Sequence, residues 1–326
     1  MVQTKALYNM LRISASTGTP VQAEPWALED LRAVPIEQLW KRLEVFDIRL
    51  DAKSMTQFSA KSDTPEEFTD LIVSEDEEPS FYDQVYLILF ELWRRLFPER
   101  STLSVFADEL DHQIEKYAKE ELETDEPIQN ALAELSEILD EHVDRGMKPK
   151  EAFDAVSDYC ANDLESFLYL FISNLLDQEN PSYAQELTEE FAPYFLKHST
   201  FDFLQIRLQN FADPIEANKK LDLLISKKLS LPLLFDVLQF LVDSGDHAIF
   251  LKTVRQIFSH LKTEEELQEL LDLSAEYFAR LDKDDREQAI LQIKGRRKSI
   301  QHELNSSDPD IIRLKEILLT SIPPIK

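Results

Sequence analysis

The sequence predicts an all-α fold, with an irregular multi-helical bundle followed by stacked helical hairpins of the α-solenoid, tetratricopeptide- or HEAT-like type. Only four of the 326 residues are glycine, whereas average usage of about 7% would give roughly 23. Glycine-dependent hairpin turns and phosphate loops are therefore scarce. Apolar residues recur at helical spacing through most of the chain, and prolines or capping residues stand where many of these segments begin.

The clearest helical segment is 164–176, with the sequence LESFLYLFISNLL. Its apolar residues follow the i, i+3, i+4, i+7 pattern of one helix face: Leu164, Phe167, Leu168, Phe171, Ile172, Leu175 and Leu176. Tyr169 and Leu170 add apolar surface on a second side. We therefore expect a helix covered from more than one direction, as stacked hairpins require.

Residues 1–23 contain no acidic residue but carry Lys5 and Arg12, which is a local shift of composition in an acidic protein. A short helix is possible around residues 6–11, and SASTGTP reads as a linker. The sequence predicts a flexible N-terminal arm here. Its functional alternatives are an export signal or a segment that docks in a partner's groove.

Residues 24–122 are predicted to form an N-terminal helical bundle. Short helices are expected at 26–33 and 36–46, with further starts at Asp51 and Thr64. The densest apolar segment, 81–97, should be the central helix, packed against a helix over 102–121. The acidic stretch EELETDEP ends at Pro127 and is the expected domain boundary.

Residues 127–326 are predicted to form the helical-hairpin domain. Helices are expected at 127–143, closed by Gly146, and at 149–160. Later helices should begin near Ser182, Thr200, Pro214, Leu231, His247, Glu264, Asp285 and Pro309. Helix pairs thus recur roughly every 31 to 38 residues, the range of helical-hairpin solenoids. The small residues of the tetratricopeptide pattern do not fall in register, so no repeat family is assigned.

The formal net charge of −28 favours a basic protein partner over nucleic acid or an anionic membrane. The single cysteine, Cys160, excludes an intramolecular disulfide and points to a reducing compartment. No apolar run reaches the ~18 residues of a membrane span, and no apolar signal-peptide core is present. We therefore expect a cytoplasmic protein without a membrane span, with secretion by a signal-peptide-independent route as the alternative.

Few residues indicate catalytic chemistry, and we predict no catalytic residue, metal or cofactor. Glu109 and His112 have the Glu-x-x-His spacing of di-metal helical proteins, but no second copy of the motif exists. Cys160 lies among apolar neighbours, which suits a small buried side chain. Residues 282–285 lack the glycine and distal glutamate of a calcium loop, so they are expected to end one helix and cap the next.

Lys294, Arg296, Arg297 and Lys298 form the only dense basic cluster. They could bind an anion or an acidic peptide of a partner. The alternative is a solvated helix face that pairs with acidic residues of the same chain.

These observations favour a non-enzymatic scaffold, adaptor or regulator that holds a partner peptide or helix in a helical groove. One alternative is a secreted effector or secretion-system regulator that uses the N-terminal arm as its signal. Another is a helical metal-dependent hydrolase that uses Glu109 and His112.

Overall fold

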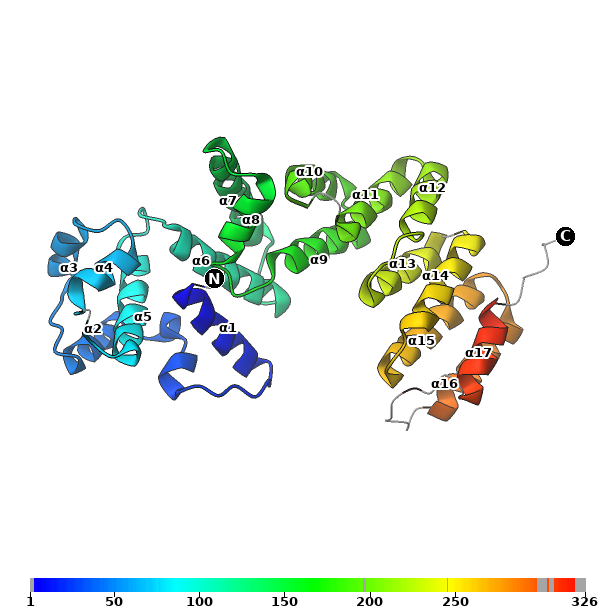
Figure 1. Cartoon of the computed structure of the whole chain (residues 1–326), viewed down its shortest axis with the longest axis horizontal. Coiled ribbons are helices and arrows are strands. Elements are labelled where there is room, and N and C mark those ends of the chain that lie inside the picture. Colours follow the sequence, from blue (N-terminus) through cyan, green and yellow to red (C-terminus); the bar gives the residue numbers. More distant parts are fainter. Residues whose placement is uncertain are drawn as a thin grey trace. The chain divides into compact units, whose positions relative to one another are not determined.

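The computed structural model describes residues 3–74, 76–195, 198–244, 246–297, 304 and 308–319. These residues contain seventeen α-helices, three short 3₁₀-helices and no strand, which confirms the all-α class (Figure 1). The chain divides into two compact units, residues 1–170 and 171–326. Helical hairpins are present in both units, whereas a regular solenoid geometry stays a prediction.

In the first unit α5 contacts α2, α4 and η2, and α6 contacts α1 and α7. The contacts thus join both neighbouring and distant segments of the chain. Its elements are α1 (Thr4–Ser16), η1 (Pro25–Leu28), η2 (Leu31–Ala33), α2 (Ile36–Val45), α3 (Ala52–Ser59), α4 (Pro65–Ile72), α5 (Pro79–Leu96), α6 (Leu103–Ala118), α7 (Glu126–Asp144) and α8 (Pro149–Ser157). Helix α9 (Leu164–Asp177) runs across the division.

In the second unit α11 packs on α10 and α12, and α15 packs on α13 and α16. Its elements are α10 (Pro181–Phe191), η3 (Ala192–Phe195), α11 (Ser199–Ala212), α12 (Pro214–Leu224), α13 (Leu231–Ser244), α14 (His247–His260), α15 (Glu264–Arg280), α16 (Asp284–Arg297) and α17 (Pro309–Leu319). Each α-helix of this list begins within one residue of its predicted start.

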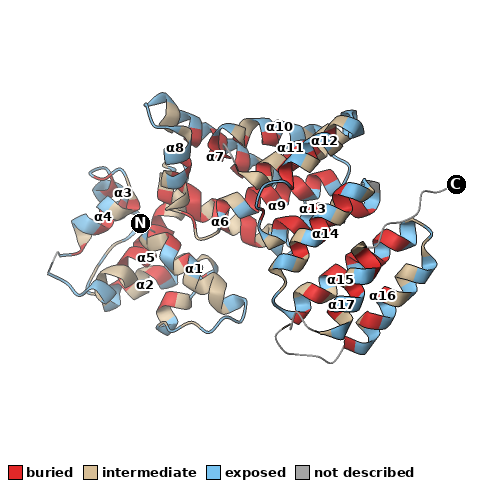
Figure 2. Ribbon diagram, turned by 45° about the vertical axis from the view of Figure 1, so that its right-hand side comes forward, coloured by how far each residue is buried: buried red, intermediate tan, exposed pale blue. Residues whose placement is uncertain are grey.

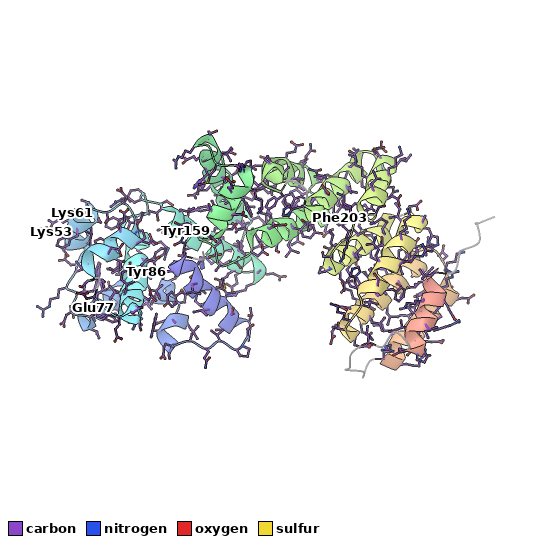
Figure 3. The ribbon with its side chains drawn as sticks, viewed as in Figure 1. Lys53, Lys61, Glu77, Tyr86, Tyr159 and Phe203 are labelled. Carbon is purple, nitrogen blue, oxygen red and sulfur yellow. The ribbon has the colours of Figure 1, made fainter. Side chains whose placement is uncertain are left out.

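Helix α5 is the centre of the first unit, as its apolar density predicts. Trp93 is fully buried, with Phe68 and Phe97 against its ring and the Arg100 guanidinium 4.5 Å from the ring centre. Tyr86 is also buried and donates a hydrogen bond to Glu66 (2.7 Å) (Figure 3). In both units the buried residues follow the inward faces of the helices and leave polar faces outside (Figure 2).

The helix ends carry the local signals expected of them. Thr263 and Glu266 form a capping box at the start of α15, and the Asp213 side chain accepts from two backbone N–H groups of α12. Gly146 has φ +101°, and N–H groups of Gly146 and Met147 reach back to the last turn of α7 at 2.8 and 3.1 Å. This is the Schellman closure that only a residue tolerant of positive φ makes without strain.

Residues 4–16 differ from the predicted flexible arm, because they form helix α1 packed on η1 and α6. Ala6 is fully buried, and Lys5 and Arg12 pair with acidic residues of α6. The acid-free composition is thus explained by the acidic surface on which α1 lies. The region 26–33 also differs, since two 3₁₀ turns replace one helix there.

The division between the units falls after Leu170 rather than at residues 122–127. Helix α7 packs on α6, and the buried Asp111 of α6 accepts hydrogen bonds from the backbone N–H groups of Ala161 and Asn162 at 2.8 and 3.0 Å. The acidic stretch before Pro127 is therefore a loop within the first unit. Of the second-side residues predicted on α9, Tyr169 is 8% exposed but Leu170 is 57% exposed.

Candidate functional site

Two hollows lie on either side of helix α11 in the second unit. The hollow between α10 and α11 has a volume of about 500 Å³, and the hollow between α11 and α12 has a volume of about 280 Å³. Gln205 lines both and is exposed. We call this surface the α11 groove; its lining includes Gln185, Thr188, Gln205, Leu208, Gln209 and Leu223.

The sequence of α11 places apolar residues on more than one side of the helix. Phe203 is part of the buried face (Figure 3). Phe211 at the other end of α11 is 54% exposed, and Ile215 and Leu223 on α12 are 73% and 69% exposed. Single exposed apolar residues are ordinary, but three large ones on two adjacent helices, one of which (Leu223) lines a hollow, mark a surface suited to a protein partner.

The charges around the α11 groove are unevenly distributed. On the α12 side, Lys227 pairs with Asp202 (2.8 Å) and Lys219 pairs with Glu216 (3.1 Å). Helix α10 carries Glu186, Glu189 and Glu190. Among the described residues these three glutamates form no ion pair, although Glu189 accepts a hydrogen bond from Gln185. The groove is therefore lined by amides and apolar side chains together with Glu189, Asp202, Lys220 and Lys227, and the α10 side is the more negatively charged.

The predicted basic cluster lies at the end of α16, and its described members all contact carboxylates. Arg297 is 2% exposed and binds both carboxylate oxygens of Glu264 at 2.9 and 2.8 Å and Asp308 at 2.7 Å. Arg296 pairs with Asp310 at 2.7 Å. Lys294 pairs with Asp272, and Lys298 lies outside the described residues.

These contacts favour the interpretation that the basic residues pair with acidic residues of their own chain. The hydrogen bonds that Arg297 donates to Glu264 raise the pKa of the Arg297 guanidinium above its ordinary value despite burial. Burial opposes ionisation of Glu264, but hydrogen bonds from Arg297 outweigh it and hold the pKa of that carboxyl below its ordinary value. Both groups are therefore charged at neutral pH. Anion binding by this cluster stays a prediction.

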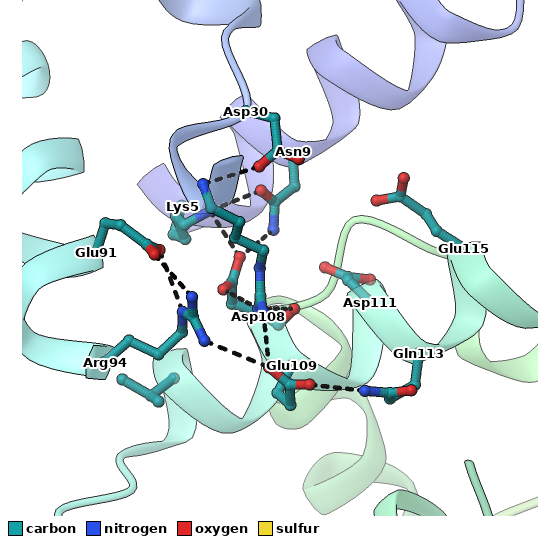
Figure 4. A network of polar contacts seen from close by, with 12 residues as sticks. Lys5, Asn9, Asp30, Glu91, Arg94, Asp108, Glu109, Asp111, Gln113 and Glu115 are labelled. Atoms are coloured by element: carbon teal, nitrogen blue, oxygen red, sulfur yellow. Dashed lines mark hydrogen bonds and ion pairs between the residues drawn. The ribbon is translucent and has the colours of Figure 1, made fainter. Parts of the chain in front are cut away.

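Glu109 and His112 both lie on α6. Glu109 belongs to a network of polar contacts (Figure 4). Both oxygens of Glu109 are engaged, one by Arg32 (2.8 Å) and one by Gln113 (2.7 Å). Burial lowers the pKa of His112, and the nearby Arg32 lowers it further. No group of three or more His, Cys, Asp or Glu side chains in the described part of the chain is arranged to hold a metal ion.

Asp108, the neighbour of Glu109, is the centre of that network. Its side chain is 2% exposed and contacts Lys5 (2.6 Å), Asn9 (2.8 Å) and Arg32 (2.5 Å). Burial opposes its ionisation, but the two cations outweigh burial and lower its pKa well below the ordinary range. Asp108 is therefore a charged structural residue that joins α1, η2 and α6.

Cys160 is buried, 5% exposed, and its thiol contacts the backbone oxygen of Val156. Burial raises the pKa of the thiol well above its ordinary value, and the charge of Asp111 raises it further. A neutral, covered thiol is a poor nucleophile.

We expect Cys160 in the native protein to react with a thiol reagent at least about tenfold more slowly than in urea. Absorbance of the released thiolate measures both rates. A variant with Gln205→Cys supplies an exposed thiol in the same chain as the positive control. Equal rates for Cys160 with and without urea would show that the region around α8 is open.

The α11 groove was not predicted from the sequence. The sequence offers one signal for this surface: the apolar residues Phe211, Ile215 and Leu223 of α11 and α12 lie outside the buried faces of their helices. Sequence reasoning assigns such residues to the core by default, and only the packing of α10, α11 and α12 leaves them outside.

No helix of the described chain is long and apolar enough to cross a membrane. Neither a protein-family model, nor a curated protein, nor a solved structure matches the chain.

Proposed function

We propose that this chain is a non-enzymatic interaction protein that binds an amphipathic helix of a partner protein in the α11 groove. The observation that carries the proposal is the pair of hollows that flank α11, with Leu208 lining the larger one and the exposed Leu223 lining the smaller one. A helix that lays an apolar face into a groove is a common mode of peptide recognition.

The charge of the groove indicates the chemistry of the partner. The glutamates of α10 form no ion pair within the described residues, and the whole chain carries a net charge of −28. A partner helix with lysine or arginine beside its apolar face would therefore associate faster and in a preferred orientation. Amides such as Gln205 and Gln209 can donate to and accept from the polar edge of such a helix.

No described contact favours the other two functions suggested by the sequence. The hydrolase would need Glu109 free to bind a metal, but both its oxygens are occupied by Arg32 and Gln113. The secreted effector or regulator would use residues 1–23 as an accessible signal, whereas residues 4–16 are a docked helix. Cytoplasmic localisation remains a prediction that rests on the single cysteine and the reducing compartment it suggests.

The proposal is tested with a display library of helical peptides selected on the full-length protein. We expect the selected peptides to combine an apolar i, i+3, i+4, i+7 face with basic residues. Leu208→Asp/Leu223→Asp should weaken their binding at least about tenfold, measured by fluorescence anisotropy, because the two changes place a charge in each hollow against the apolar face of the peptide.

The matched control is Phe58→Asp/Leu71→Asp, which makes the same change at two residues of the first unit that are 45% and 55% exposed. It should leave the affinity unchanged. Because Cys160 is covered, a thiol-reactive fluorophore should label the Gln205→Cys variant at position 205. The fluorescence of that label should change when the peptide binds, since Gln205 lines both hollows. Selected peptides that bind both double variants as tightly as the wild type would contradict the proposal.

A further inference from the structure

The contact between α1 and α6 in the first unit is matched charge for charge. Lys5 and Arg12 are seven residues apart on α1, and their partners Asp108 and Glu115 are seven residues apart on α6. Lys5 Nζ lies 2.6 Å from Asp108, and Arg12 donates to both oxygens of Glu115 at 3.2 and 2.6 Å. Seven residues are two helical turns, so one face of α1 aligns with one face of α6. Figure 4 shows one end of this contact, where Lys5 and Asn9 meet Asp108.

Apolar burial contributes little to the attachment of α1. Ala6 is its only fully buried apolar side chain among the described residues, while Leu7 and Met10 are 44% and 36% exposed. The ring of Tyr8 is tilted against that of Trp26, with the ring centres 5.4 Å apart, and its hydroxyl donates to Asp83. By comparison, α5 buries most of its apolar residues. Because the free energy of attachment comes mainly from polar contacts, α1 is more easily detached than α5.

The surface beneath α1 does not depend on α1 for charge compensation. Asp108 keeps its ion pair with Arg32 (2.5 Å), and Glu115 keeps Lys119 (3.5 Å). Removal of α1 would therefore leave neither carboxylate buried without a cation, which is the usual reason that a charged helix cannot leave. Residues 17–24 between α1 and η1 contain no helix and allow such a movement.

We propose that α1 is a displaceable basic helix that covers a second binding surface, the acidic face of α6. The occupant that replaces α1 is a helix of a partner protein with two cations seven residues apart and a polar residue between them, as Lys5, Asn9 and Arg12 are on α1. The covered state is an autoinhibitory contact. This inference concerns the first unit and does not depend on the α11 groove.

The experiment uses full-length protein and a labelled synthetic peptide of residues 3–16 as the probe. In Lys5→Gln/Arg12→Gln the internal helix is weakened, so this variant should bind the peptide at least about tenfold more tightly than the wild type does. Binding should fall when sodium chloride rises from about 0.05 to 0.5 M, because partly exposed ion pairs are screened. A peptide with glutamine at positions 5 and 12 should not bind.

The matched control is Lys53→Gln/Lys61→Gln, which removes two exposed charges from the same unit and should behave as the wild type does (Figure 3). Hydrogen exchange should show loss of protection in α1 of the Lys5→Gln/Arg12→Gln variant, with α5 still protected. If that variant does not fold, Arg12→Gln alone should give the same order of affinities.

Two results would overturn the proposal. One is unchanged protection of α1 in the variant together with no peptide binding, which would make α1 a permanent part of the fold. The other is a released α1 with no binding of the peptide, which would mean that the α6 face does not accept a helix.

Discussion

Replacing Arg297 with alanine is expected to lower the free energy of unfolding of the second unit by about 3–5 kcal/mol. Arg297 is 2% exposed and Glu264 is 6% exposed, and the guanidinium binds both oxygens of that carboxylate. Without Arg297 the buried carboxylate of Glu264 keeps, among the described residues, only the hydrogen bond from Gln268 (3.0 Å). A buried charge without a cation is the costly outcome, whereas the intact pair contributes less than this difference suggests.

The neighbouring residue supplies the control. Arg296 has a side chain that is 58% exposed and pairs with Asp310, so Arg296→Ala should cost less than about 1 kcal/mol. Urea titration followed by circular dichroism measures both variants. The three tryptophans all lie in the first unit, so their fluorescence shows whether that unit is unaffected. Equal stabilities of the two variants would show that the Arg297 pair is not buried in solution.

Replacing Phe171 with alanine is expected to cost about 3–5 kcal/mol, because it removes a large apolar side chain from a packed interior. Phe171 is 1% exposed and stands in the middle of α9, with Leu168 fully buried one turn before it. The burial of these two residues confirms the face predicted for 164–176. Thermal or urea unfolding of the full-length variant measures the loss.

The adjacent residue is again the control, since Leu170 is 57% exposed. Leu170→Ala should change stability by a few tenths of a kcal/mol at most, as is usual for surface substitutions. A loss in Leu170→Ala as large as that in Phe171→Ala would mean that the second side of α9 is covered after all, as the sequence alone suggests.

The helices and their ends could be predicted because their causes are local. Thr263 and Glu266 cap α15 from three residues apart, Asp213 and Pro214 start α12, and Gly146 closes α7. Each signal acts between residues one to five apart in the chain, so the sequence itself contains both partners. The same holds for the periodic apolar face of 164–176.

The candidate sites could not be predicted in the same way. Lys5 and Asp108 are 103 residues apart. The chain has 63 acidic and 35 basic residues, so the sequence allows many other pairings. The α11 groove likewise depends on how closely α10 and α12 approach α11, which no local pattern encodes. The basic residues near Arg297 are visible as a cluster in the sequence, whereas their carboxylate partners come from α15 and α17.

The sequence by itself determined that this protein is all-helical, where most of its helices begin, and which face of most helices is buried. These properties follow from glycine content, capping residues and apolar periodicity, which act over a few residues. Only the tertiary structure decided that residues 4–16 are a docked helix, that residues 127–170 belong with the first unit, and that Leu170 and Phe211 stay exposed. Those outcomes depend on contacts between distant segments, where charge pairing and packing select one arrangement among many.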